Sequence, residues 1–241
     1  MTTRELRLQI AHNVRHLGGY KTQDGRQTNE DLIRSAGLHR LTEESLGTLR
    51  DLGVRTVVDF RSEVERERDA TPDLAPYGIK KVLAPVWDKD ASPPGMAGEF
   101  PGYAAVYPLM LEVGTFAFRT LFETIADTDG RVVFHCAAGK DRTGIASALL
   151  LEVAGVSDAT ILEDYRQSAE LLMPVLKEWL PRMAERGITE AMALKLMASD
   201  EPDMASTLTV LRERWGSAEG YLRHAGVGED VIASVRARMV A

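Results

Sequence analysis

Cysteine is almost absent from this sequence: its 241 residues contain one, Cys136. A single thiol cannot form a disulfide within the chain, which excludes a disulfide-stabilised fold and favours a reducing compartment. A lone cysteine is most often a small buried hydrophobic residue. The residues around Cys136 therefore have to decide whether it has a chemical role.

An excess of positive charge is absent as well. Acidic residues outnumber Lys and Arg by 36 to 29, for a formal net charge of −7. The overall field therefore does not attract nucleic acid or an anionic membrane, and we expect no nucleic-acid partner. Any phosphate-binding site has to be local.

Long hydrophobic runs are the third absence. The most apolar stretch, residues 103–122, contains Pro108, Glu112 and Arg119, so it does not qualify as an uninterrupted membrane span. The first twenty residues lack an apolar core followed by a small-residue cleavage site, and so do not form a secretory signal. We expect a cytoplasmic protein without an integral membrane segment, with export that needs no cleavable signal as the alternative.

What the sequence does contain is a regular alternation of strand and helix patterns. The predicted strands are 54–60, around 79–85 and 131–134, and the predicted helices are 42–52, 103–127 with a bend at Pro108, and 142–154. A Pro- and Gly-rich loop is expected at 88–101, and helices dominate after 154. This pattern predicts an α/β fold with a central, mostly parallel sheet flanked by helices, and a helical C-terminal part, in one domain over 1–241.

The helical segment 171–204 is rich in methionine. Core packing is the default interpretation of Met173, Met183, Met192, Met197 and Met204. The alternative hypothesis is that this segment, together with residues 103–122, forms a mobile lid.

The chemistry is concentrated between the strand 131–134 and the helix 142–154, in the segment HCAAGKDRTG from His135 to Gly144. A loop that enters a helix N-terminus presents free backbone N–H groups, which together with the helix dipole form an anion site. Cys136 heads this loop and Arg142 follows six positions later. The binding part of the loop consists of His135, Ala137, Ala138, Gly139, Lys140 and Gly144.

Each residue type in this loop suits phosphate-ester chemistry. The amides, the helix N-terminus and Arg142 favour the thiolate of Cys136, which can attack phosphorus, while Arg142 offers a planar fork to two phosphate oxygens. Thr143 can donate its hydroxyl to the sulfur when the thiolate leaves, and His135 can hold the loop. Gly139 and Gly144 permit a tight curl and close helix packing.

The acid that protonates the leaving group is not determined by these residues. Asp88, Asp90 and Asp141 are the candidates: Asp88 opens the Pro- and Gly-rich loop, whereas Asp141 lies next to the phosphate site but could instead bind water or Lys140. Lys140 is either a second positive charge for substrates with several phosphates or a solvated lysine. We interpret Asp59 and Arg61 as a structural ion pair.

The segment HCxxGKDRTG resembles the signature loop of the protein tyrosine phosphatase superfamily. Its Lys140–Asp141 pair resembles the motif of the atypical bacterial and fungal tyrosine phosphatases, whose members are also similar to phosphoinositide phosphatases. Residues 13–20, 34–35, 59–62 and 164–165 look like accessory motifs of that group. The usual Trp-Pro-Asp of the acid loop is absent, since Trp87 and Asp88 are adjacent.

This resemblance implies a cysteine-dependent phosphatase that hydrolyses phosphotyrosine, and in addition phosphoserine, phosphothreonine or phosphoinositides, through a phosphocysteine intermediate. It implies no metal and no cofactor, and His, Cys and carboxylates do not cluster at metal-ligand spacing. A phosphoinositide phosphatase and a non-catalytic phosphate-binding module are the alternatives. A thiol reductase would need a second cysteine, which the chain lacks.

Overall fold

A computed structural model describes residues 5, 11–87, 101–185 and 187–240 of the chain. Its centre is a five-stranded sheet with the strand order β1-β2-β5-β3-β4. The strands are β1 (Arg15–His16), β2 (Leu32–Ser35), β3 (Val54–Asp59), β4 (Lys80–Leu83) and β5 (Arg131–His135). All neighbours are parallel except β1, which is antiparallel to β2. The predicted α/β class with a mostly parallel sheet is confirmed.

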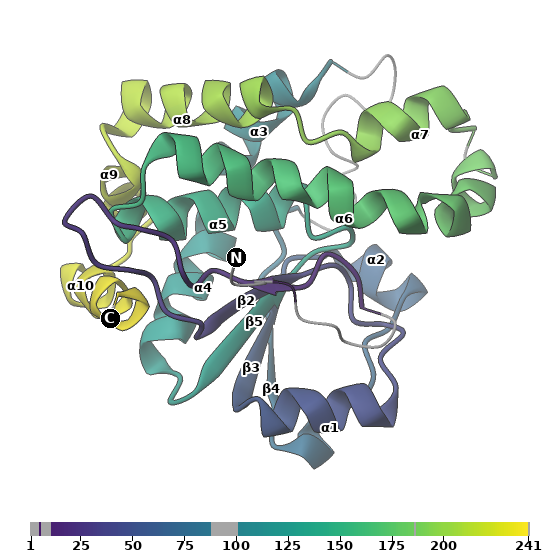
Figure 1. The fold of residues 1–241 in the computed structure, drawn as a ribbon, viewed down its shortest axis with the longest axis horizontal. Helices are drawn as coiled ribbons and strands as arrows, with labels where there is room; N and C mark the ends of the chain where they lie inside the picture. Colours follow the sequence, from purple (N-terminus) through teal and green to yellow (C-terminus); the bar gives the residue numbers. More distant parts are fainter. Residues whose placement is uncertain (1–4, 6–10, 88–100, 186, 241) are drawn as a thin grey trace.

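Helices surround this sheet (Figure 1). Before the signature segment the chain forms α1 (Glu43–Asp51), α2 (Glu63–Arg68), the short 3-10 helix η1 (Ala75–Tyr77), α3 (Tyr103–Val113) and α4 (Thr115–Asp127). After it come α5 (Asp141–Val153), α6 (Asp158–Ala184), α7 (Glu190–Met197), α8 (Glu201–Trp215), α9 (Ala218–His224) and α10 (Glu229–Met239). The stretch after 154 is helical as predicted.

Two hydrophobic cores form on opposite faces of the sheet, because successive strand residues point to opposite sides. In β5, Val132 and Phe134 join the larger core with α3, α4, α5 and the C-terminal helices, whereas Val133 joins the smaller core with α1. The same alternation separates Val58 from Val57 in β3. Both faces of the central strands are thus covered, which explains their nearly continuous apolar sequences.

The prediction of one continuous helix over residues 103–127 is wrong. Pro108 lies inside α3 without ending it, and the break comes at Gly114, between α3 and α4. A Cβ at residue 114 would lie 2.5 Å from the Met110 carbonyl oxygen and 2.7 Å from the Phe118 ring. The close approach of these two helical segments therefore requires glycine at the break.

Two further elements differ from the sequence-based expectation. Strand β2 was not predicted, because its four residues, Leu32–Ser35, include an arginine and form a short, fully buried strand. The methionine-rich segment 171–204 spans the end of α6, all of α7 and the start of α8. Met197 and Met204 are buried, but Met173 and Met192 are each 45 % exposed, so core packing is the wrong interpretation for these two.

No helix in the part of the chain that the structure describes is both long and apolar enough to cross a membrane.

Candidate active site

The signature segment lies where the sequence predicts it, between the end of β5 at His135 and the start of α5 at Asp141. Cys136 and Arg142 are both largely buried, with 1 % and 9 % of their surface exposed. His135 is the register partner of Asp59, at the end of the neighbouring strand β3. The loop therefore starts at the carboxyl edge of the sheet, the usual ligand-binding edge of an open α/β fold.

The backbone carbonyls of the signature loop are held from outside the loop. Gly37 N donates to Ala137 O (2.9 Å), Asn13 Nδ2 to Ala138 O (3.1 Å) and to Gly139 O (2.9 Å), and Arg34 Nη2 to Gly139 O (2.8 Å). In a trans peptide the next N–H points opposite to the carbonyl, and the described residues contain no cis peptide. The amides of Ala138, Gly139 and Lys140 consequently point away from these donors, into the curve of the loop.

Gly139 is required at the tightest point of this curve. Its φ of +66° lies in the left-handed region, and a Cβ there would be 2.4 Å from the Ser35 carbonyl oxygen. Both the backbone angle and the close approach of β2 exclude a larger residue.

A buried ionic network holds Asn13 and Arg34, the two side chains that donate to the carbonyls of the signature loop. Asp164 in α6 accepts from Arg15 Nε (3.0 Å) and Tyr20 Oη (2.8 Å), and it also binds Arg34 Nη1. Burial alone would raise the pKa of Asp164, but Arg15 and Arg34 outweigh it and hold that pKa well below its usual value. The network accounts for three of the accessory motifs, because residues 13–20, 34–35 and 164–165 together support the back of the loop.

Arg142 is held by a residue that the sequence analysis did not single out, Glu65 in α2. Its two terminal nitrogens donate to the two carboxylate oxygens of Glu65, at 2.6 and 2.7 Å. Burial raises the pKa of Glu65, but the bonds from Arg142 dominate and lower it to about 2. Burial lowers the pKa of Arg142, but Glu65 and the nearby Cys136 outweigh it and hold that pKa above its usual value. The available signal was the capping-box spacing of Ser62 and Glu65 at the start of α2.

His135 and its neighbours are fully buried behind the loop. His135 Nδ1 lies 3.1 Å from the Cys136 carbonyl oxygen, and burial lowers the pKa of its imidazole. Arg61 forms a fork on Asp59, with Nε and Nη2 at 2.9 and 2.8 Å from its two oxygens. The Asp59–Arg61 pair thus has the buried, mutually satisfied geometry of a structural ion pair.

Lys140 is not a solvated lysine, because it is completely buried. Its ammonium donates to the carbonyls of Leu196 (2.8 Å) and Ala198 (2.7 Å) and lies 3.6 Å from the centre of the Tyr103 ring. Burial lowers the pKa of Lys140, although the Asp141 carboxylate 3.2 Å away opposes this effect. The Lys140 side chain therefore joins the signature loop to the last turn of α7 and to the connection that follows it.

The remaining predicted residues lie on α5 or outside the described residues. Asp141 Oδ1 accepts a hydrogen bond from Tyr107 Oη at 2.6 Å. The Thr143 hydroxyl is buried and has no hydrogen-bond partner among the described residues, and a Cβ on Gly144 would lie 3.2 Å from the Tyr165 ring. Asp88 and Asp90 fall in 88–100, outside the described residues.

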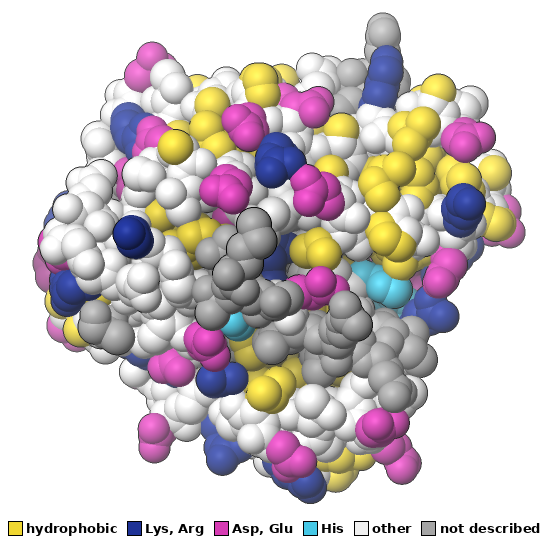
Figure 2. Space-filling model, viewed as in Figure 1, with side chains coloured by type: hydrophobic (Ala, Val, Ile, Leu, Met, Phe, Trp, Pro, Cys, Tyr) yellow, Lys and Arg dark blue, Asp and Glu magenta, His cyan; other side chains and the backbone are white. Residues whose placement is uncertain are grey.

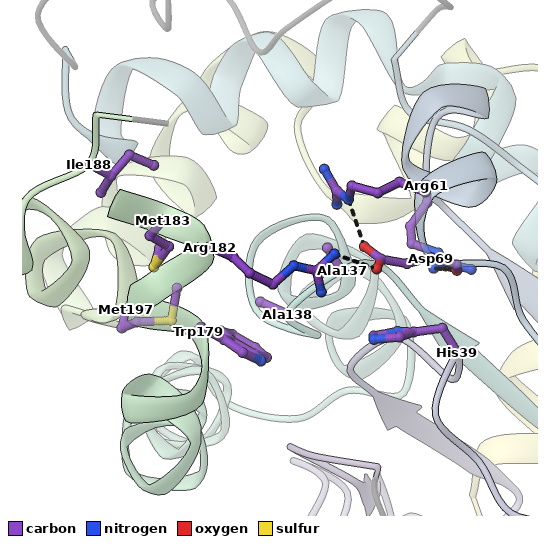
Figure 3. A pocket seen from close by; sticks show the side chains of 11 residues that line it. His39, Arg61, Asp69, Ala137, Ala138, Trp179, Arg182, Met183, Ile188 and Met197 are labelled. Atoms are coloured by element: carbon purple, nitrogen blue, oxygen red, sulfur yellow. Dashed lines mark hydrogen bonds and ion pairs between the residues drawn. The ribbon is translucent and has the colours of Figure 1, made fainter. Parts of the chain in front are cut away.

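A cavity of about 230 Å³ opens beside Ala137 and Ala138 of the loop. Figure 3 shows Trp179, Met183, Ile188 and Met197 on one side of it and His39 and Asp69 on the opposite side. Figure 2 shows further apolar side chains on the outer surface of α6 and α7, where Met173, Met192 and Leu194 are exposed. Among the described residues, no group of three His, Cys, Asp or Glu side chains is placed to hold a metal ion.

Comparison with known proteins decides the family. A family model described as the tyrosine phosphatase family matches residues 6–241. The chain belongs to the tyrosine phosphatase family. This phosphatase is 32 % identical to a tyrosine-protein phosphatase of Nostoc commune, over 86 % of this chain and 73 % of that protein. It is 29 % identical to the triple specificity protein phosphatase PtpB of Mycobacterium tuberculosis, over 85 % of this chain and 89 % of that protein.

A solved structure, that of TpbA from P. aeruginosa, matches 81 % of this phosphatase and 86 % of its own chain, with a TM-score of 0.41 and 19 % identity.

The two charged hydrogen bonds between Arg142 and Glu65 in this phosphatase lead to a first prediction. We expect Glu65→Gln to lower kcat on para-nitrophenyl phosphate by up to about 100-fold, because an amide cannot hold the guanidinium by two charged bonds and small misplacements are costly. KM should change much less than kcat if Arg142 acts mainly in the transition state. Steady-state kinetics at neutral pH measures both.

Glu67→Gln is the matched control, since Glu67 is exposed on the same helix and should leave both constants unchanged. Equal kinetics for Glu65→Gln and Glu67→Gln would mean that Glu65 does not position Arg142.

Proposed function

We propose that this phosphatase hydrolyses phosphotyrosyl residues of proteins through a phosphocysteine intermediate on Cys136. The observation that carries the proposal is the signature loop, whose outward-bonded carbonyls leave a run of inward amides between Cys136 and the first turn of α5. Such a run of amides at a helix N-terminus binds a tetrahedral anion. The names of the Nostoc and Mycobacterium relatives agree with this substrate class.

The reaction has two steps. The thiolate of Cys136 attacks phosphorus in line, so that an S–P bond forms as the P–O bond to the tyrosyl oxygen breaks, and that oxygen takes up a proton. Water then attacks phosphorus, the S–P bond breaks, and inorganic phosphate leaves while the thiolate is restored. We propose that the unpartnered Thr143 hydroxyl donates to the departing sulfur.

Arg142 can serve both steps without leaving Glu65. The two bonds to Glu65 use one N–H of each terminal nitrogen, and a guanidinium carries five N–H donors in a fixed plane. Nη1 also donates to the Phe60 carbonyl oxygen at 3.4 Å. The Nε–H and the second N–H of Nη2 remain for two equatorial oxygens of the phosphoryl group, where charge develops in the transition state.

We propose Asp88 as the acid that protonates the tyrosyl oxygen. Asp141 is the weaker candidate, because its carboxylate already accepts a hydrogen bond from Tyr107 and lies 3.2 Å from the Lys140 ammonium, so that two neighbours already engage it. In this proposal Asp141 has a structural role and connects the signature loop to α3 through the hydrogen bond from Tyr107.

The dependence of kcat on the leaving group distinguishes the general acid from a carboxylate with a structural role. An alkyl phosphate needs protonation more than an aryl phosphate with an acidic leaving group, so Asp88→Asn should lower kcat by about 10²- to 10⁴-fold on the alkyl ester and far less on the aryl ester. Asp141→Asn and the control Asp90→Asn should affect both esters equally. A selective loss on the alkyl ester in Asp141→Asn would assign the acid to Asp141 instead.

A substrate panel tests the proposed function as a whole. Initial rates on a phosphotyrosine peptide, a phosphoserine peptide and a phosphoinositide in vesicles should be highest on the phosphotyrosine peptide, and rapid acid quench should trap one phosphoryl group on Cys136. Faster turnover of the lipid would favour a phosphoinositide phosphatase. Binding of all three without turnover would leave only a phosphate-binding module.

We propose one phosphatase domain over 1–241, which agrees with the match over 6–241, and a cytoplasmic location without nucleic-acid partners. Segment 171–204 packs on Ala138 and is bonded to Lys140. Both contacts agree with a lid formed by this segment and residues 103–122 beside the loop.

A further inference from the structure

The cavity beside the signature loop has two chemically different walls (Figure 3). The wall formed by α6, α7 and the segment between them is apolar, with the half-buried Trp179 and three aliphatic or thioether side chains. The opposite wall consists of His39 and of the charged groups at the end of α2, which Arg182 reaches from α6. Ala137 and Ala138, which follow Cys136 directly, lie between the two walls.

The charged wall contains two arginines that share one carboxylate. Asp69 accepts from Arg68 Nε at 2.8 Å and from Arg182 Nη2 at 2.9 Å. Arg68 ends α2 whereas Arg182 comes from α6, so the two guanidinium groups reach Asp69 from different parts of the fold. Burial raises the pKa of Asp69, but these bonds dominate and lower it to about 2.

Among the described residues, the positive charge in this group exceeds the negative charge by one. Two guanidinium groups meet one ionised carboxylate, and the third arginine of the cavity, Arg61, is already paired with Asp59. This local excess contrasts with the net charge of −7 of the whole chain. Because Asp69 holds both side chains in place, less conformational entropy is lost when they bind an anion.

We propose that this cavity receives a phosphotyrosyl peptide with an acidic residue beside the phosphotyrosine, with Arg68 and Arg182 as the subsite for that second carboxylate. The inference rests on the proposed function, since it places the phosphoryl group at Cys136. The apolar wall favours a phosphotyrosyl side chain and its neighbours over an inositol ring. The hydroxyl groups of inositol need hydrogen-bond partners, and Trp179, Met183, Ile188 and Met197 offer at most one, the indole N–H.

The test is a set of kinetic measurements on the full chain with two peptides. One carries glutamate on both sides of the phosphotyrosine, and the other carries glutamine at the same positions. The measured quantity is the ratio of kcat/KM for the acidic peptide to that for the neutral peptide. Since an exposed charge pair contributes at most about 1 kcal/mol, we expect each arginine to account for up to about a 5-fold preference in wild type.

Arg182→Gln and Arg68→Gln should each reduce this ratio by that factor, and the double variant should bring it close to one. Arg166→Gln is the matched control, because Arg166 is an exposed arginine of the same α6 that pairs with Glu170 away from the cavity. It should leave the ratio unchanged.

Three outcomes overturn the proposal. They are a wild-type ratio near one, an equal loss on both peptides in the arginine variants, and a larger loss on a phosphoinositide than on the acidic peptide. Failure of the proposed function is recognised separately, because wild type would then either leave para-nitrophenyl phosphate intact or turn over a phosphoinositide faster than both peptides. Activity on that ester with no peptide preference would reject the subsite alone.

Discussion

Cys136→Ser is expected to lower kcat on para-nitrophenyl phosphate by at least about 10⁴-fold, because a serine hydroxyl is not ionised at neutral pH and is a far weaker nucleophile than a thiolate. The Cys136 side chain is buried and its replacement is nearly isosteric. The carbonyls of the loop are held by Gly37, Asn13 and Arg34 and not by the thiol. The anion site should therefore survive in the variant.

Two measurements separate loss of the nucleophile from loss of the fold. Steady-state kinetics gives the rate, and calorimetry with a phosphotyrosine peptide gives the affinity, which should be retained in Cys136→Ser. Residual activity above about a tenth of wild type would mean that the sulfur is not the nucleophile. Loss of binding together with activity would point to a distorted loop.

Asp164→Asn is expected to destabilise the protein by about 3–5 kcal/mol, because it leaves the buried side chains of Arg15 and Arg34 without their carboxylate. The same two arginines orient Asn13 and the Gly139 carbonyl. The variant should therefore also lose activity, even though Asp164 is not itself in the loop. Urea denaturation at pH 7 measures the free energy of unfolding.

Asp158→Asn provides the comparison on the same helix. Asp158 is 51 % exposed and pairs with Arg212 at the surface, so its replacement should cost less than about 1 kcal/mol. A similarly small effect for Asp164→Asn would contradict the proposed role of the network.

The pH dependence of stability adds an independent check on Asp164. Its pKa is depressed in the folded state, so its contribution is fully present above the unfolded value of about 3.9 and is lost as pH falls toward the folded value. As the pH is lowered from 5 toward the folded-state pKa of Asp164, the free energy of unfolding should therefore decrease less for Asp164→Asn than for wild type.

Elements defined by neighbouring residues were predicted well. Thr42 caps α1 as expected, accepting from Ser45 N, and the β-branched runs became β3 and β5. The position of the signature segment between strand and helix also follows from local patterns, because a short buried strand, a glycine-containing loop and a helical repeat lie next to each other in the chain.

Features that depend on distant segments were not predictable from one sequence. Glu65 lies 77 positions from Arg142, and Asp164 lies 149 positions from Arg15. In the sequence Lys140 looks like an ordinary loop lysine. Its burial depends on the distant connection after α7, where the Ala198 carbonyl accepts from its ammonium. The break at Gly114 is imposed by contacts between two helices whose individual patterns are both helical.

The amino-acid sequence alone thus determined that this chain is α/β and that Cys136 and Arg142 flank one loop between a strand and a helix, because hydrophobic periodicity, caps and turns act over a few residues. The tertiary structure alone decided what holds that loop and what lies beside it. Buried charges acquire partners only when the chain has folded, so the Glu65 fork, the Asp164 network and the Arg68–Asp69–Arg182 cluster follow from the topology.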